Sequence, residues 1–182
     1  MSNSPWDEPV VVRGTPLAQP RRPQWPWEQP DRIKRSRDFL RENICEDYLV
    51  KVFDETAKYI NRYGLGYNFV REDEATFVVR ASCLAPTNRS WVCKFGNTEA
   101  DFILFFGFRD RENPTLKFCL VLPLSRFGDR DRIIILDDGY HIKGYREFWI
   151  SDEKLAEMQA VMDAIRRQDS EVLERHLPRP LR

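Results

Sequence analysis

The sequence predicts an α+β fold with a long N-terminal helix, a mixed sheet of about five or six strands, and C-terminal helices. Two observations support this prediction. Apolar residues recur at spacings of three and four before Gly64 and again after Ser151, which is typical of amphipathic helices. Between Tyr67 and Leu136, short stretches that alternate in polarity or are continuously apolar are separated by turn residues, as strands are.

The predicted N-terminal helix begins near Asp31 and ends near Tyr63, where Gly64 and Gly66 terminate it. Its apolar residues share one face, so we expect that face to pack on the core. These residues are Leu40, Ile44, Tyr48, Val52, Thr56, Tyr59 and Tyr63.

The central segment predicts strands bounded by turn residues. Residues 75–83 alternate in polarity, as in a half-buried strand, whereas 102–108 and 116–122 are continuously apolar, as in central strands covered on both faces. A hairpin-like turn at 110–114 is expected to join these two. The predicted strands are 67–69, 75–83, 91–95, 102–108, 116–122 and 133–136, and Asp137-Asp138-Gly139 is a predicted turn.

The C-terminal segment predicts two helices. Ser151 is a good N-cap, and acidic residues follow it in the first turn. Asp169 or Ser170 can cap a last short helix before Pro178. The apolar face of the longer helix is formed by Leu155, Met158, Met162 and Ile165.

The charges of the chain are balanced. It has 182 residues, with 29 basic and 29 acidic side chains and a formal net charge of +0. This balance argues against a dedicated polyanion binder, although a local basic patch remains compatible with it. Basic residues in the second half could converge on a phosphate backbone or lie in solvated loops of mixed charge, and both interpretations stay open. These residues are Arg109, Arg111, Arg126, Arg130, Arg132, Arg179 and Arg182.

Nothing in the sequence predicts a membrane segment. The longest apolar runs are too short to span a bilayer, and the N-terminus lacks the apolar core of a signal peptide. We therefore expect an intracellular, cytoplasmic protein without a membrane partner. No C-x-x-C pair and no Cys/His zinc cluster is present. We expect buried free thiols at Cys45, Cys83, Cys93 and Cys119, although a hairpin could also bring Cys83 opposite Cys93.

Residues 1–30 form a proline-rich arm that precedes a single predicted α+β domain at 31–177 and a short tail at 178–182. The arm carries Trp6, Trp25 and Trp27. Large aromatic side chains on an extended backbone suit docking into a groove of a protein partner. They could equally pack back on the domain of the same chain, and composition does not separate the two interpretations.

A series of short motifs links the first helix to the predicted strands. A glutamate within the helix is followed by an acidic stretch, a strand, a Trp-x-x-x-Phe strand, and two apolar strands. The segments are FDETAKYI with Glu55, Glu72-Asp73-Glu74, FVVRAS, WVCKF, ADFILFFGF and FCLVLP. Over residues 46–136 this order resembles the PD-(D/E)XK nuclease fold, in particular its homing-endonuclease and mobile-element branch.

The resemblance implies a Mg²⁺ site held by acids, with a basic residue near the scissile phosphate. Glu55 would take the place of the helix acid, and one of Glu72, Asp73 and Glu74 that of the first-strand acid. Asp73 or Glu74 would be the metal ligand if the site is active. Val78 stands where the family has its second ligand, and Arg80 stands where it has lysine. Arginine binds phosphate but cannot act as a base. The pattern therefore implies a catalytically degenerate site, with Mg²⁺ as a cofactor only if the site is active.

Two functions follow as hypotheses. The first is a nuclease-like domain that binds DNA or RNA through Arg80 and the basic helix start, which contains Arg32, Lys34 and Arg35. The alternative is a non-enzymatic subunit or adaptor that docks on a protein partner through the Trp/Pro-rich arm.

Hydrolase chemistry is not favoured. Ser125 and His141 have Asp137 and Asp138 nearby in the sequence, but no G-x-S-x-G motif surrounds the serine.

Overall fold

The structure is a computed structural model that describes residues 48–60, 69–96, 98–110, 115–127 and 129–176. Helices and strands within these ranges confirm the α+β class. The elements are α2 Val50–Phe53, β1 Lys58–Tyr59, β2 Phe69–Val70, β3 Thr76–Cys83, β4 Ser90–Lys94, β5 Phe102–Phe108, β6 Leu116–Pro123, α3 Leu124–Phe127, β7 Arg132–Leu136, α4 Gly139–Gly144, η3 Arg146–Phe148, α5 Asp152–Arg167 and α6 Ser170–His176.

The strands form a mixed sheet, as the sequence predicts, and also a second, two-stranded sheet that the sequence does not predict. The main sheet has five strands in the order β1-β2-β3-β5-β6, and β4 and β7 form a separate two-stranded sheet. Strand β3 is parallel to β5, and the other neighbours are antiparallel. Strand β6 is covered on both faces, but it lies at the edge of the main sheet and not at its centre.

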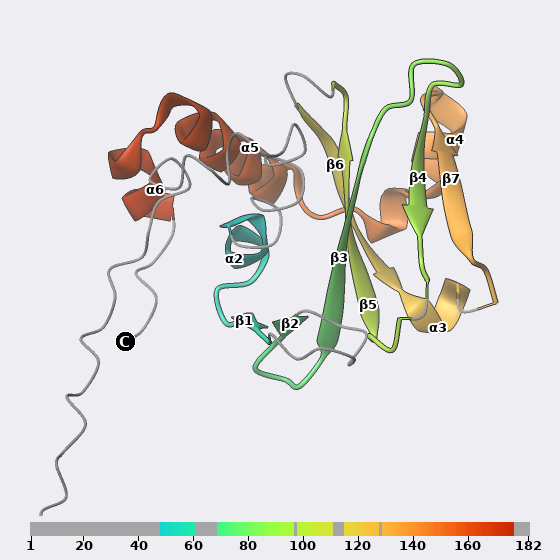
Figure 1. The fold of residues 1–182 in the computed structure, drawn as a ribbon, viewed down its shortest axis with the longest axis horizontal. Helices are drawn as coiled ribbons and strands as arrows, with labels where there is room; N and C mark the ends of the chain where they lie inside the picture. The colour runs from blue at the N-terminus through green and yellow to red at the C-terminus, as the bar shows by residue number, and fades with distance from the viewer. Residues whose placement is uncertain (1–47, 61–68, 97, 111–114, 128, 177–182) are drawn as a thin grey trace, which may run out of the picture.

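The main sheet separates two hydrophobic cores. Figure 1 shows α2, α5 and α6 on one side of the main sheet, and the small sheet with α4 on the other. Because side chains alternate along a strand, β5 contributes to both cores. Leu104 and Phe106 pack with Met158 and Met162 of α5, whereas Phe105 packs with the inner face of the small sheet. The continuous apolar run of β5 is thus explained by cover from both sides.

The predicted N-terminal helix is too long at its C-terminal end. Helix α2 ends at Phe53, and Lys58–Tyr59 is a strand that pairs with β2. The Asp54 carboxylate accepts hydrogen bonds from the Thr56 N–H at 2.9 Å and hydroxyl at 2.7 Å. This local turn competes with helical hydrogen bonding, so the prediction that helix continues to Tyr63 is wrong over 54–60. The predicted stretch 31–47 lies outside the described residues.

The two C-terminal helices are confirmed together with their caps. The Ser151 hydroxyl accepts a hydrogen bond from the Lys154 N–H at 3.2 Å at the start of α5. The Asp169 carboxylate accepts one from the Val172 N–H at 3.1 Å at the start of α6. Met158, Met162 and Ile165 are buried, as the apolar face predicts, and Leu155 packs at its margin.

The described cysteines are free thiols on two sides of the main sheet. Cys83 is half-buried against the core under α5, whereas Cys93 is buried in the core under the small sheet. A Cys83–Cys93 disulfide is therefore not formed. Cys119 is also buried, and Cys45 lies outside the described residues. In the described part of the chain, no helix is long and apolar enough to cross a membrane.

Candidate binding site

The acids that the nuclease-like pattern selects lie in exposed turns. Glu55 follows α2, and Asp73 and Glu74 belong to the turn between β2 and β3. The Asp73 carboxylate accepts a hydrogen bond from the Ala75 N–H at 3.2 Å and pairs with Arg71 at 3.2 Å. Glu74 has a φ of 66°, as a turn residue can. Nowhere in the described ranges do three or more His, Cys, Asp or Glu side chains gather as metal ligands.

Arg80 is half-buried on β3 and makes hydrogen bonds within the protein. Its guanidinium donates to the carbonyl of Lys94 at 3.2 Å, to the Val79 carbonyl at 3.0 Å and to the Thr98 hydroxyl at 3.3 Å. Arg80 therefore points toward the small sheet, whereas Glu55 follows a helix that packs on the opposite face of the main sheet. The structure does not bring Arg80 and these acids together as one site.

The other predicted binding residues cannot be placed. Arg32, Lys34 and Arg35 of the basic helix start, and Trp6, Trp25 and Trp27 of the arm, lie outside the described residues.

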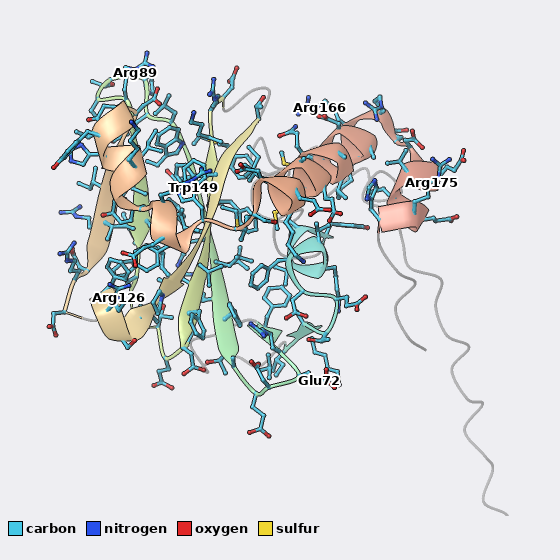
Figure 2. All side chains as sticks on the ribbon, turned by 180° about the vertical axis from the view of Figure 1, so that it is seen from behind. Glu72, Arg89, Arg126, Trp149, Arg166 and Arg175 are labelled. Carbon is cyan, nitrogen blue, oxygen red and sulfur yellow. The ribbon has the colours of Figure 1, made fainter. Side chains whose placement is uncertain are left out.

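A different site is formed where α3, α4 and η3 meet. These short elements enclose an open hollow of about 690 Å³. It lies on the side of the main sheet that carries the small sheet, whereas the β2–β3 turn, marked by Glu72, lies on the other side of the molecule from Arg126 (Figure 2). The hollow is lined by Arg126, Phe127, Tyr140, His141, Lys143, Gly144, Tyr145, Glu147 and Phe148.

Asp138 positions the α4 side of this hollow. As N-cap of α4, its Oδ1 accepts hydrogen bonds from the Tyr140 N–H at 3.0 Å and the His141 N–H at 2.5 Å. Its Oδ2 lies 2.9 Å from Nδ1 of His141. The hydrogen bonds from the His141 N–H and ring hold the pKa of Asp138 below its usual range. The predicted turn at 137–139 thus begins a helix, and His141 lies on α4.

Aromatic rings in edge-to-face contact and the Arg126 guanidinium form the part of the lining that α3 and η3 supply. Phe127 meets Phe148 edge-to-face, with ring centroids 5.5 Å apart. The guanidinium of Arg126 lies 5.1 Å above the Phe148 ring and pairs with Glu147 at 2.9 Å. The guanidinium of Arg130 lies 6.0 Å from the centroid of the Phe127 ring. Both arginine side chains therefore make cation–π contacts with aromatic rings.

Tyr140 and Lys143 are exposed groups that line the hollow, and the Tyr140 ring meets the His141 ring edge-on at 6.0 Å. Tyr140 is 86% exposed, which is unusual for so large an aromatic side chain. Among the described residues, Lys143 forms no ion pair. The arrangement can therefore stack a planar group on an aromatic ring and hold an anion beside it.

The hollow has no nucleophile activated by a base. Ser125 lies on α3 but does not line the hollow, and no described hydrogen bond joins it to His141. Asp138 thus caps α4 and also contacts the His141 ring. The two residues do not form part of a catalytic triad.

Sequence reasoning overlooked this site, although its aromatic residues were visible as Phe127, Tyr140, Tyr145 and Phe148 among basic residues. No protein-family model matches the chain, and no curated protein matches it.

Proposed function

We propose that this protein binds single-stranded nucleic acid at the hollow between α3, α4 and η3, and that it does so without cleaving the strand. The observation that carries the proposal is the 86% exposed ring of Tyr140 beside the ammonium of Lys143, which pairs with no acid of the described residues. Proteins that bind single strands combine aromatic side chains, on which bases stack, with cations that follow the phosphate backbone.

The kinds of side chain that line the hollow suit such a ligand. A base would stack on Tyr140, and the phosphates would be held by Lys143 and Arg126, with Arg130 nearby beside the Phe127 ring. Because Arg126 is already paired with Glu147, the electrostatic contribution is modest, and stacking supplies most of the affinity. A flexible single strand can present an unstacked base, whereas a duplex cannot.

The proposal keeps the nucleic-acid ligand that the nuclease-like pattern implies but moves it to another site. Cleavage is not proposed, because Arg80 is engaged by backbone carbonyls and lies on the other face of the main sheet from Glu55. A phosphate at Asp73 and Glu74 would also meet two exposed carboxylates.

Fluorescence anisotropy tests this function. The full-length protein is titrated into labelled single-stranded and double-stranded DNA and RNA, at low and moderate salt with Mg²⁺ present. We expect single strands to bind more tightly than duplexes, and we expect Tyr140→Ala to weaken binding by about 5- to 100-fold, as loss of one stacking contact does. Lys143→Ala should reduce the slope of log K against log salt by about 1.

Arg167→Ala is the matched control for Lys143→Ala. Arg167 is an exposed cation on α5, away from the hollow, so its loss should leave binding unchanged. Equal binding by the wild type and Tyr140→Ala would overturn the proposal, and so would the appearance of shortened strands in samples with Mg²⁺.

A second function, that of a protein adaptor, is favoured by the pairing of charges on the same surface. Arg126 pairs with Glu147 at 2.9 Å and Arg146 with Asp152 at 3.5 Å, which leaves little net charge. Arg and Tyr are also the residues that dominate protein interfaces. If no nucleic acid binds at low salt, this function predicts that a co-purifying partner is lost when residues 1–30 are removed, or when Trp25 and Trp27 are replaced by Ala.

A further inference from the structure

The small sheet has two outer edges, and the edge of β4 is closed by hydrogen bonds. The Ser90 carbonyl accepts a hydrogen bond from the Ala85 N–H at 2.9 Å. The Val92 N–H donates to the Ser82 hydroxyl at 3.2 Å, and the Lys94 carbonyl accepts from Arg80 at 3.2 Å. Two side chains of β3 and the backbone of Ala85 therefore occupy the hydrogen-bonding groups on the outer edge of β4. In this structure Arg80 binds that edge.

The edge of β7 is open. In the antiparallel ladder, Cys93 pairs with Ile133 and Trp91 with Ile135. Two further hydrogen bonds extend this ladder, from the Phe95 N–H to the Asp131 carbonyl and from the Asp137 N–H to the Arg89 carbonyl. Because hydrogen-bonded pairs alternate in an antiparallel ladder, these bonds determine which residues of β7 face β4. The N–H and C=O groups of Arg132, Ile134 and Leu136 point the other way. No group among the described residues bonds to them.

This open edge is apolar at its centre and has an exposed cation, Arg132, at its start. Ile134 is 48% exposed, and Ile134 and Tyr140 are the large hydrophobic side chains exposed in the described part of the chain. Natural proteins block free edges with proline, charged side chains, bulges or covering segments. The sequence RIIIL of β7 has no proline, and its one charged residue, Arg132, is the first residue of the strand and not the central one. In Figure 1, β7 lies on the far side of β4 from the main sheet, at the outside of the molecule.

We propose that β7 docks against β7 of a second copy of this chain, antiparallel, with Ile134 opposite Ile134 of the second copy. This register is set by the groups that point outward, because Ile134 lies at the centre of the open stretch from Arg132 to Leu136. The pairing joins the two small sheets into one continuous sheet across a two-fold axis.

The charges that flank β7 are complementary in this arrangement. Arg130 lies opposite Asp138 of the second copy, and Arg132 lies opposite Leu136 of the second copy, next to the acidic end of its β7. The pairing also places Asp131 opposite Asp137 of the second copy. Arg89 binds Asp137 at 2.6 Å and compensates this repulsion. At the centre, the exposed surface of Ile134 is buried against the same residue of the second copy.

The inference rests on the edge of β7 and not on the hollow, so it is independent of the proposed function. Its test is the molar mass of the full-length protein in solution, measured by analytical ultracentrifugation over a roughly hundredfold concentration range. We expect the mass to rise from monomer to dimer with concentration. A monomer at every concentration would overturn the proposal.

Two substitutions at Ile134 separate the backbone contribution from the side-chain contribution. Ile134→Pro removes an outward N–H and leaves the ladder with β4 intact, because proline is tolerated where the N–H of an edge strand faces solvent. Ile134→Thr keeps the N–H and the β-branched shape but removes apolar surface. The proline variant should be monomeric and the threonine variant a weaker dimer. Dimerisation of a folded proline variant at the wild-type concentration would contradict the proposal.

A cysteine variant keeps the test decisive if the proline variant fails to fold. Opposite residues in an antiparallel pair have Cα atoms about 4.5–5.5 Å apart, within the range that a disulfide bridges. Ile134→Cys should therefore form a covalent dimer under mild oxidation. Glu174→Cys, on the exposed face of α6, is the matched control and should remain monomeric. Equal cross-linking of the two variants would contradict the register.

Discussion

Thr76 and Asp101 bind each other where the parallel strands β3 and β5 begin. The N–H and the hydroxyl of Thr76 donate to the same carboxylate oxygen of Asp101, at 2.9 and 2.7 Å. In return the Asp101 N–H donates to the Thr76 hydroxyl at 2.9 Å. Parallel strands lack a hairpin to fix their register, so this contact sets where the pairing starts.

The Thr76–Asp101 contact makes stability depend on pH. The hydrogen bonds from Thr76 lower the pKa of Asp101. The ionised Asp101 carboxylate therefore stabilises the folded protein above the usual pKa of a carboxyl group, and this contribution is lost as the pH falls below about 4. Because Asp101 is exposed, we expect Asp101→Asn to cost about 1 kcal/mol or less at pH 7. Urea denaturation at pH 7 and at about pH 3 would measure this. A difference between wild type and variant that persists undiminished at low pH would contradict the assignment.

Gly107 on β5 is required because the Phe118 ring of β6 lies over its backbone. A Cβ added to Gly107 would overlap atoms of this ring, which is itself buried between Trp91 and Phe105. Gly107→Ala should therefore lower the free energy of unfolding by about 1–3 kcal/mol, as overpacking does. Thermal or urea unfolding measures this change.

Gly144→Ala is the control for Gly107→Ala, because a Cβ at Gly144 meets nothing within 4 Å. It should leave stability unchanged or raise it slightly. The double variant Gly107→Ala, Phe118→Leu should be more stable than the sum of the two single changes predicts, since a smaller side chain relieves the overlap. Strict additivity of the two changes would show that overlap with the Phe118 ring is not the cause of the lost stability.

Trp91 of the small sheet packs against β5 and β6 of the main sheet. Its side chain is fully buried, its indole N–H donates to the Phe108 carbonyl at 2.7 Å, and its ring meets Phe118 edge-on at 5.0 Å. Trp91→Phe would remove this hydrogen bond and leave a void, although the Phe108 carbonyl would still accept a hydrogen bond from the Leu84 N–H at 2.8 Å. We expect a loss of about 1–3 kcal/mol in the free energy of unfolding. Trp149→Phe, at a half-buried position, should cost less, and a reversed order would contradict this role.

The strands could be predicted from the sequence, but their division into two sheets could not. Alternation at Trp91, Cys93 and Phe95 shows that one face of a strand is buried, and these residues are indeed buried, the first two in β4 and Phe95 directly after it. The same alternation would suit a strand within the main sheet. Long-range contacts, such as that between Trp91 and Phe108, decide which strands pair and which strands pack on another sheet. Such contacts produce no periodic pattern of apolar residues in the sequence.

The error at the N-terminal helix has a local cause. Thr56 and Tyr59 continue the apolar spacing of the preceding residues, yet the Asp54–Thr56 turn ends the helix before them. A side chain that binds the backbone two residues ahead can override periodicity over a single turn.

The candidate site could not be predicted because exposure is not visible in the sequence. Tyr140 and Tyr145 are both aromatic residues in polar surroundings, but Tyr145 packs against the core and Tyr140 is 86% exposed. Arg80 is the opposite case. Its match to a nuclease-like motif predicted a residue that binds a ligand, whereas its guanidinium donates a hydrogen bond to the Lys94 carbonyl within the protein.

Thiol reactivity tests the placement of the cysteines on the two sides of the main sheet. Burial raises the pKa of Cys93 to about 12 and raises that of Cys119 as well. At about pH 8 neither is a thiolate, so in a Cys45→Ser variant only the half-buried Cys83 should react with a thiol reagent in the folded protein. Denaturant should expose all remaining thiols. Rapid reaction of Cys93 in the folded protein would mean that the small sheet separates from the main sheet in solution, since its thiol is reached only when β4 lifts away from β5.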